Sequence, residues 1–129
     1  LVLAGTFGGA TFLFTGDLDR AGERAIAKRY PALRPTVVKL GHHGSKTATD
    51  PTVLRRWAPR LAIISAGRQN RYGHPNRETI ATLKRQRVPY LSTQGRGMIR
   101  YRYWGNRSHL ETKLKGSELA WMLPPYESN

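Results

Sequence analysis

The sequence predicts an α/β fold in which a mixed sheet carries helices on one face. Two observations lead to this class. Short apolar runs alternate with stretches of helical spacing, and glycine, proline or aspartate stands at the transitions between them. The expected order is β-β-α-β-α-β-α-β-β, and strands that alternate with helices build layered, largely parallel sheets. The 129 residues are enough for one domain with a hydrophobic core.

Six apolar or β-branched runs predict the strands. They are Leu1 to Ala4, Ala10 to Thr15, Thr36 to Leu40, Leu61 to Ser65, Val88 to Ser92 and Met98 to Trp104. The first two are expected to form a hairpin across the glycine turn at Gly8 and Gly9. The run from Leu61 is almost entirely apolar, which is typical of a strand buried on both faces. The run from Met98 alternates, which is typical of an antiparallel edge strand.

Three stretches combine helical spacing with start and stop signals. Leu18 to Tyr30 has apolar or small residues on one face, with Asp19 as its cap or first-turn acid. Asp50 precedes a proline and is expected to cap a second helix, which Pro59 closes. Asn76 is expected to cap a third helix, which presents two apolar side chains on one face.

The chain is predicted to consist of one folded unit over residues 1–104 and a tail over residues 105–129. The tail has only scattered apolar residues, so we expect either a short helix from Ser108 to Leu119 or disorder. We assign no role to His109. The chain starts without Met, directly in an apolar run, and we therefore expect it to be a piece of a larger protein.

Charge is the strongest global property of the chain. It has 22 Lys and Arg against 8 Asp and Glu, a formal net charge of +14, and the basic residues are spread throughout. A folded basic surface favours a polyanionic partner, with nucleic acid first and an anionic membrane surface second. A surface that serves only solubility is the alternative. Cysteine is absent, so any metal must be held by His and carboxylate, and no apolar run is long enough to span a bilayer.

Two motifs that follow predicted strands carry the residue types of a metal site. Asp17 follows the second strand, and His42 and His43 follow the third between two glycines. Strand ends are where α/β folds place their chemistry, and carboxylate and imidazole bind divalent metals. Asp17 could bridge two metals or orient a water, or else cap the next helix. Adjacent side chains on extended backbone point opposite ways, so one histidine can face a metal while the other faces the sheet.

Two further groups could contact a phosphate. Ser45 and Lys46 place a hydroxyl and a cation in a glycine turn, which is either a phosphate cradle or an ordinary solvated turn. The loop after the Leu61 strand is expected at the same sheet edge, because neighbouring parallel strands end together. Its polar cluster comprises Arg68, Asn70, Arg71, Tyr72 and His74. His74 is a candidate ligand, general acid or phosphate contact, or simply an exposed residue before a proline.

Four of these segments, in this order, resemble the metallo-β-lactamase-like domain of ComEC-type DNA-uptake proteins. They are Phe12 to Asp17, Lys39 to Ser45, Ile64 to Gly67 and Asn70 to Pro75, within residues 1–103. The resemblance implies an αββα fold, a two-metal site with Zn or Mn in the intact domain, and nuclease action on the DNA strand that is not imported during competence. It also implies a soluble domain of a bacterial membrane channel protein, on the outer side of the cytoplasmic membrane.

The resemblance assigns roles to particular residues. Asp17 matches the bridging aspartate, and His43, with His42 as the alternative, matches the last metal ligand. Ser45, Lys46 and His74 match positions near the substrate phosphate. Catalytic roles are accordingly expected for Asp17, Lys46 and His74. Substrate contacts are expected from Ser45, Lys46, Arg68, Asn70, Arg71 and His74.

One departure from the family pattern changes the expectation. The family's main ligand motif, His-x-His-x-Asp-His, is absent from this chain, which has only four histidines. The chain therefore resembles the C-terminal half of such a domain, a nuclease fragment that is inactive alone, with no metal bound and no small-molecule cofactor. The expected partners are DNA, the N-terminal half of the domain and the membrane channel of the parent protein. Such a half would expose the sheet face that the other half covers, which predicts marginal stability, self-association or a rearranged tail over that face. The alternative is a non-catalytic basic module that binds DNA phosphates.

Overall fold

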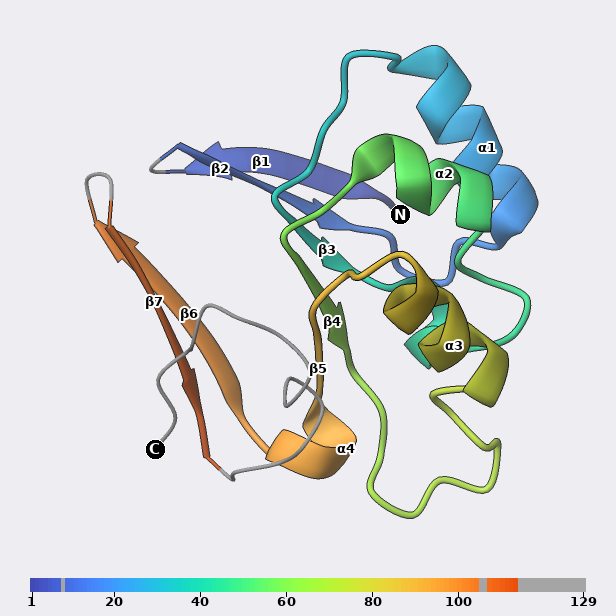
Figure 1. The fold of residues 1–129 in the computed structure, drawn as a ribbon, viewed down its shortest axis with the longest axis vertical. Coiled ribbons are helices and arrows are strands. Elements are labelled where there is room, and N and C mark those ends of the chain that lie inside the picture. Colours follow the sequence, from blue (N-terminus) through green and yellow to red (C-terminus); the bar gives the residue numbers. More distant parts are fainter. Residues whose placement is uncertain (8, 105–106, 114–129) are drawn as a thin grey trace.

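A computed structural model describes residues 1–7, 9–104 and 107–113 of the chain. Its centre is a five-stranded sheet in the order β1-β2-β3-β4-β5 (Figure 1). The strands are β1 (Leu3–Phe7), β2 (Ala10–Phe14), β3 (Val37–Lys39), β4 (Leu61–Ile64) and β5 (Tyr90–Ser92). β1 and β2 pair antiparallel and the other neighbours pair parallel. The predicted α/β class and mixed sheet are thus confirmed.

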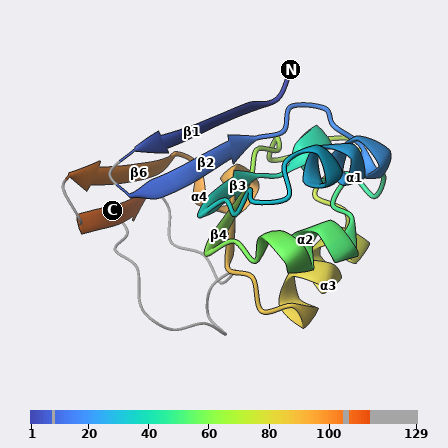
Figure 2. The same ribbon diagram turned by 90° about the horizontal axis from the view of Figure 1, so that it is seen from above.

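Helices cover one face of this sheet. They are α1 (Arg20–Arg29), α2 (Pro51–Trp57) and α3 (Arg77–Arg85), and Figures 1 and 2 show them together on one side. Each begins at the predicted cap. Asp19 accepts a hydrogen bond from the N–H of Gly22 at 2.8 Å, and Asn76 accepts one from Glu78 at 2.9 Å. These caps satisfy N–H groups that a helix start leaves without partners.

The main core lies between the helices and the sheet. Leu13, Val38 and Ile64 point from three neighbouring strands into one cluster with Trp57 of α2 and Leu83 of α3, and all five are at most 4% exposed. The apolar residues of β3 and β4 alternate between this cluster and a second one on the opposite face. Both faces of the central strands are therefore buried, as the near-continuous apolar sequence predicted.

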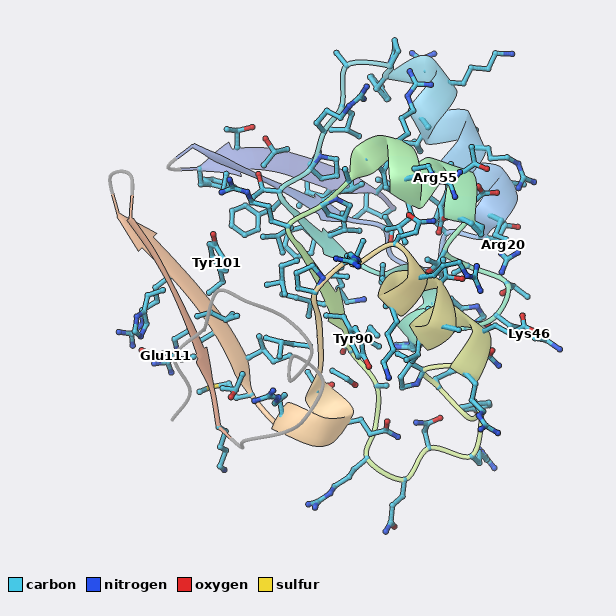
Figure 3. The ribbon with its side chains drawn as sticks, in the orientation of Figure 1. Arg20, Lys46, Arg55, Tyr90, Tyr101 and Glu111 are labelled. Atoms are coloured by element: carbon cyan, nitrogen blue, oxygen red, sulfur yellow. The ribbon has the colours of Figure 1, made fainter. Side chains whose placement is uncertain are left out.

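A hairpin covers part of the opposite face. Its strands are β6 (Ile99–Trp104) and β7 (Arg107–Thr112), which pair antiparallel in a separate sheet. Tyr101 faces the main sheet, and its ring meets Phe12 of β2 edge-on with a centroid distance of 5.4 Å (Figure 3). Leu110 packs into the same second cluster, while Glu111 on the outer face pairs with basic side chains.

This hairpin corrects two expectations from the sequence. Residues 107–112 form a strand rather than the beginning of a helix at Ser108, because Arg, His and Glu alternate there with the uncharged Ser, Leu and Thr with period two. The strand at Ile99 pairs with β7 and not with the edge of the main sheet. The short helix α4 (Thr93–Arg96) connects β5 to the hairpin. The remainder of the predicted tail, residues 114–129, lies outside the described residues, and the proposed domain boundary stays a prediction.

The hairpin does not cover the whole face. Leu3 and Phe7 of β1 and Phe14 of β2 remain 60%, 54% and 44% exposed. The expectation of an uncovered sheet face therefore holds for the β1–β2 end, while β3 to β5 are covered. Among the residues that the structure describes, none of the helices has the length and apolarity that a bilayer crossing requires.

Asp50 gives a prediction for stability. One of its carboxylate oxygens accepts the N–H groups of Thr52 (2.9 Å) and Val53 (3.1 Å), and the other pairs with Arg24 at 2.6 Å. We expect Asp50→Ala to lower the free energy of unfolding in urea by about 1–2 kcal/mol, because cap and ion pair are both lost. Asp50→Asn retains the capping oxygen and should lose less. Equal losses in the two variants would contradict this account.

The same carboxylate gives the sign of a pH dependence. Burial alone would raise the pKa of Asp50, but the N–H of Val53, the Arg24 guanidinium and the N–H of Thr52 together hold that pKa below its ordinary value of 3.8. The native state therefore binds this proton less readily than the unfolded chain does. The stabilisation by Asp50 is complete above pH 3.8 and is lost as pH falls through the native pKa. The difference between wild type and Asp50→Asn should shrink over that range.

Candidate functional site

Three histidines meet at the carboxyl edge of the sheet. His42 and His43 follow β3 in the short helix η1 (Gly41–Gly44), and His74 lies in the loop after β4. The ring centroids are 6.3 Å apart for His42 and His43, 5.7 Å for His42 and His74, and 6.4 Å for His43 and His74. β3 and β4 are parallel neighbours, so their following loops emerge side by side, as predicted from the sequence.

The backbone at the histidine pair differs from the expectation. It is not extended: His42 has φ 46° and His43 has φ 55°, a left-handed conformation that costs non-glycine residues free energy. Both rings are exposed and both lie near His74, rather than on opposite sides of a strand. The start of this turn is also tightly packed. A Cβ at Gly41 would be 2.6 Å from the carbonyl oxygen of Leu18, so only glycine fits there.

His43 is the better oriented of the two adjacent histidines. Its Nδ1 lies 2.7 Å from the carbonyl oxygen of Ser65, just past the end of β4. A carbonyl can only accept, so Nδ1 must carry the proton and, in the neutral ring, Nε2 keeps its lone pair. Histidines that bind metals or accept protons typically have their other ring nitrogen held by such a hydrogen bond. It favours His43 over His42 as the ligand, which stays a prediction.

His74 is held by its own loop. The side chain of Asn70 accepts the N–H of His74 at 2.8 Å and donates to the carbonyls of Gly67 and His74 at 2.8 and 2.6 Å. Asn70 therefore shapes the loop, while direct substrate contact by it stays a prediction. Burial lowers the pKa of His74, and the neighbouring His42 and His43 lower it further. The His74 ring is consequently uncharged at neutral pH.

The turn that carries Asp17 is tied to the histidine segment. Gly16 accepts the N–H of His42 at 2.9 Å, and the hydroxyl of Thr15 donates to the carbonyl of Lys39 at 2.8 Å. Asp17 is exposed on this turn. Asp19 caps α1, so Asp17 is not the cap of that helix. The structure thus brings the Asp17 turn and His42 side by side.

The predicted phosphate cradle is only partly present. Ser45 is 5% exposed, and its hydroxyl accepts the N–H of Thr47 at 3.3 Å and lies 3.1 Å from the Thr47 hydroxyl. That hydroxyl therefore stabilises its own turn. Lys46 is exposed, and Figure 3 shows it reaching outward beside α3. Arg68 and Arg71 are also exposed, so three cations of the predicted set remain accessible.

A metal ion needs several ligand side chains close together. Across residues 1–7, 9–104 and 107–113, no group of three or more His, Asp or Glu side chains is spaced to hold one. A zinc site uses three or four protein ligands. Asp17 and His43 are suitable ligand types at a shared edge, and whether they hold a metal stays a prediction.

Two groups that shape the site were hard to predict from the sequence. The Ser65 carbonyl orients His43, and a strand end before a glycine was the only indication of it. Tyr72 stacks on His74 with a centroid distance of 5.9 Å and an interplanar angle of 22°. Tyr72 was recognised as part of the polar cluster but was given no role of its own. Side-chain orientation in a loop cannot be read from residue spacing.

The fold and this edge define an α/β protein with its candidate site at the carboxyl ends of parallel strands. No family model matches the chain. It is 41% identical over 103 residues to ComE operon protein 3 of Bacillus subtilis, covering 80% of this chain and 13% of that protein. It is 32% identical over 127 residues to Competence protein ComA of Neisseria gonorrhoeae, covering 98% of this chain and 18% of that protein.

A third similarity is to Recombination protein 2 of Haemophilus influenzae, with 31% identity over 99 residues that cover 77% of this chain and 12% of that protein. The chain thus spans less than a fifth of the length of these curated relatives. The homologues indicate a relationship to competence DNA-uptake proteins. The resemblance found in the sequence is confirmed to that extent, and its metallo-β-lactamase-like part stays a prediction.

Proposed function

We propose that this chain is part of a DNA-hydrolysing domain in a competence-linked DNA-uptake protein, and that it is inactive alone. The observation that carries the proposal is the gathering of His43, His74 and the Asp17 turn at one sheet edge. The similarity to competence proteins supports DNA as the substrate. We further propose that the parent protein holds this domain on the outer side of the cytoplasmic membrane, next to its membrane channel.

Residues of this chain would have three separate roles in the reaction. Asp17 and His43 would be ligands of a divalent metal, Zn or Mn, whose remaining ligands come from a segment outside this chain. His74, uncharged at neutral pH, would accept or relay a proton near the scissile phosphate. The exposed Lys46, Arg68 and Arg71 would hold the phosphate backbone.

The experiment compares the parent domain with this chain alone in a DNA cleavage assay containing Mn²⁺ or Zn²⁺. The parent domain includes the upstream segment expected to carry the His-x-His-x-Asp-His motif. We expect cleavage by the parent domain only, loss of cleavage with a chelator, and loss on Asp17→Ala. Asp19→Asn, which retains the cap of α1, is the matched control. No cleavage by the parent domain with any divalent metal would contradict the proposal.

The second candidate is a basic module that binds DNA phosphates without cleaving them. The net charge of +14 favours it. It predicts that the chain binds DNA with an affinity that falls steeply with salt and is unchanged by Asp17→Ala. Binding that is absent or insensitive to salt would exclude this candidate.

A further inference from the structure

An exposed aromatic ring continues the histidine cluster toward solvent. Tyr72 is 69% exposed, although tyrosine normally buries much of its ring. Its ring is nearly parallel to that of His74, at 22° and 5.9 Å, and His74 is nearly parallel to His43, at 18° and 6.4 Å. The three rings therefore form a short column that ends at His43, the best oriented histidine.

The column stands on a fixed loop. Asn70 bonds to the backbone on both sides of Tyr72, at Gly67 and His74. Beyond the loop, the N–H of Asn76 donates to the carbonyl of Gly44 at 2.9 Å, which ties the loop to the histidine turn. The backbone that carries the exposed ring is thus held in place, which reduces the ordering of the loop that ligand binding would require.

A cation accompanies the ring. The guanidinium of Arg71 lies 5.6 Å from the centroid of the Tyr72 ring. Tyrosine rings and guanidinium planes both stack on nucleobases, and the guanidinium also attracts phosphate. An exposed aromatic ring beside an exposed cation is therefore a surface with affinity for both parts of a nucleotide.

We infer that Tyr72 is a stacking platform for an unpaired base, so that the histidine edge receives single-stranded DNA. This inference rests on the proposed function for the identity of the polymer. In a duplex the faces of each base are covered by neighbouring base pairs, so a protruding ring can stack only on a base that is unpaired or extruded. A base on Tyr72 brings the adjoining phosphates toward His74 and His43.

The test distinguishes binding through the base from binding through the phosphates. The full chain is titrated, without metal and at one ionic strength, with a short thymidine oligonucleotide, with an abasic strand of equal length and with a duplex. The two single strands carry the same number of phosphates, so their difference reports the base. We expect the thymidine strand to bind more tightly than the abasic strand, and Tyr72→Ala to weaken thymidine binding roughly 5- to 100-fold. Tyr72→Phe should keep the affinity.

The chain supplies a matched control. Tyr30 is 52% exposed and has the guanidinium of Arg29 at the same 5.6 Å, but it ends α1, away from the histidines. Tyr30→Ala should leave binding unchanged. The inference would be overturned if wild type and Tyr72→Ala bound the thymidine strand equally well, or if wild type did not bind it at all. It would also be overturned if Tyr72→Ala weakened binding of the abasic strand as much as binding of the thymidine strand. Cleavage by the parent domain without any dependence on Tyr72 would leave the proposed function standing and remove only this inference.

Discussion

His43→Ala in the parent domain is expected to reduce metal-dependent DNA cleavage by at least about 100-fold. The physical reason is the hydrogen bond from His43 Nδ1 to the Ser65 carbonyl, which fixes the ring and leaves the Nε2 lone pair available to bind a metal. His42 shares the strained turn but has no such bond among the described contacts. His42→Ala should therefore have a clearly smaller effect, measured as the initial rate of cleavage at saturating metal.

The control for this comparison is another histidine of the same chain. His109 lies on β7, where its Nε2 is 3.2 Å from Glu111, on the outer face of the hairpin. His109→Ala should leave the rate of cleavage unchanged. A variant set in which His42→Ala loses cleavage and His43→Ala retains it would show that the ligand assignment is wrong.

Gly41→Ala is expected to lower the free energy of unfolding by about 1–3 kcal/mol, since it overpacks a buried turn. The added Cβ would lie 2.6 Å from the Leu18 carbonyl oxygen and 3.2 Å from the Thr15 hydroxyl oxygen. The first of these is backbone and cannot rotate away. The two turns that carry Asp17 and the histidines would have to separate. Urea denaturation monitored by tryptophan fluorescence, to which the buried Trp57 contributes, measures the loss.

Gly67→Ala is the matched control for Gly41→Ala. Gly67 also follows a strand, but a Cβ there would meet only the Asn70 Cβ at 3.7 Å, an ordinary contact. We expect the free energy of unfolding of Gly67→Ala to differ from that of wild type by no more than about 0.5 kcal/mol. If both glycine variants were equally stable, the close approach of the two turns would not be a constraint on this fold.

Much of the fold followed from local signals. Asp19, Asp50 and Asn76 were predicted as helix caps, and each accepts the expected backbone N–H groups. Capping is a short-range interaction, so the residues next to the cap determine it. The burial of β4 on both faces was also predicted, because such a strand requires an almost uninterrupted apolar sequence.

The parts that sequence reasoning missed depend on contacts between distant segments. The left-handed backbone at His42 and His43 lies in a turn that packs closely against the turn at Leu18, a segment distant in the sequence. The strand at Arg107–Thr112 is stable because it pairs with β6 and packs Leu110 on the sheet. A six-residue alternation was too short to be distinguished from a weak helix by pattern alone.

The sequence predicted where the candidate site lies but not how its side chains are oriented. Parallel neighbours place the loops of His43 and His74 together, which the strand order alone implies. The bond to the Ser65 carbonyl and the ring column through Tyr72 depend on side-chain orientation. Ser45 was expected to face a phosphate, yet its hydroxyl is used by the turn itself. Residue type therefore identified the edge but not which atoms remain available there.

The most direct test of the central claim is the metal content of the parent domain after purification and dialysis. The claim is that the histidine edge of this chain contributes ligands to a metal site that another segment completes. It predicts that the wild-type domain retains Zn or Mn, that His43→Ala and Asp17→Ala retain less, and that His109→Ala retains as much as wild type. Equal metal content in all four proteins would contradict it.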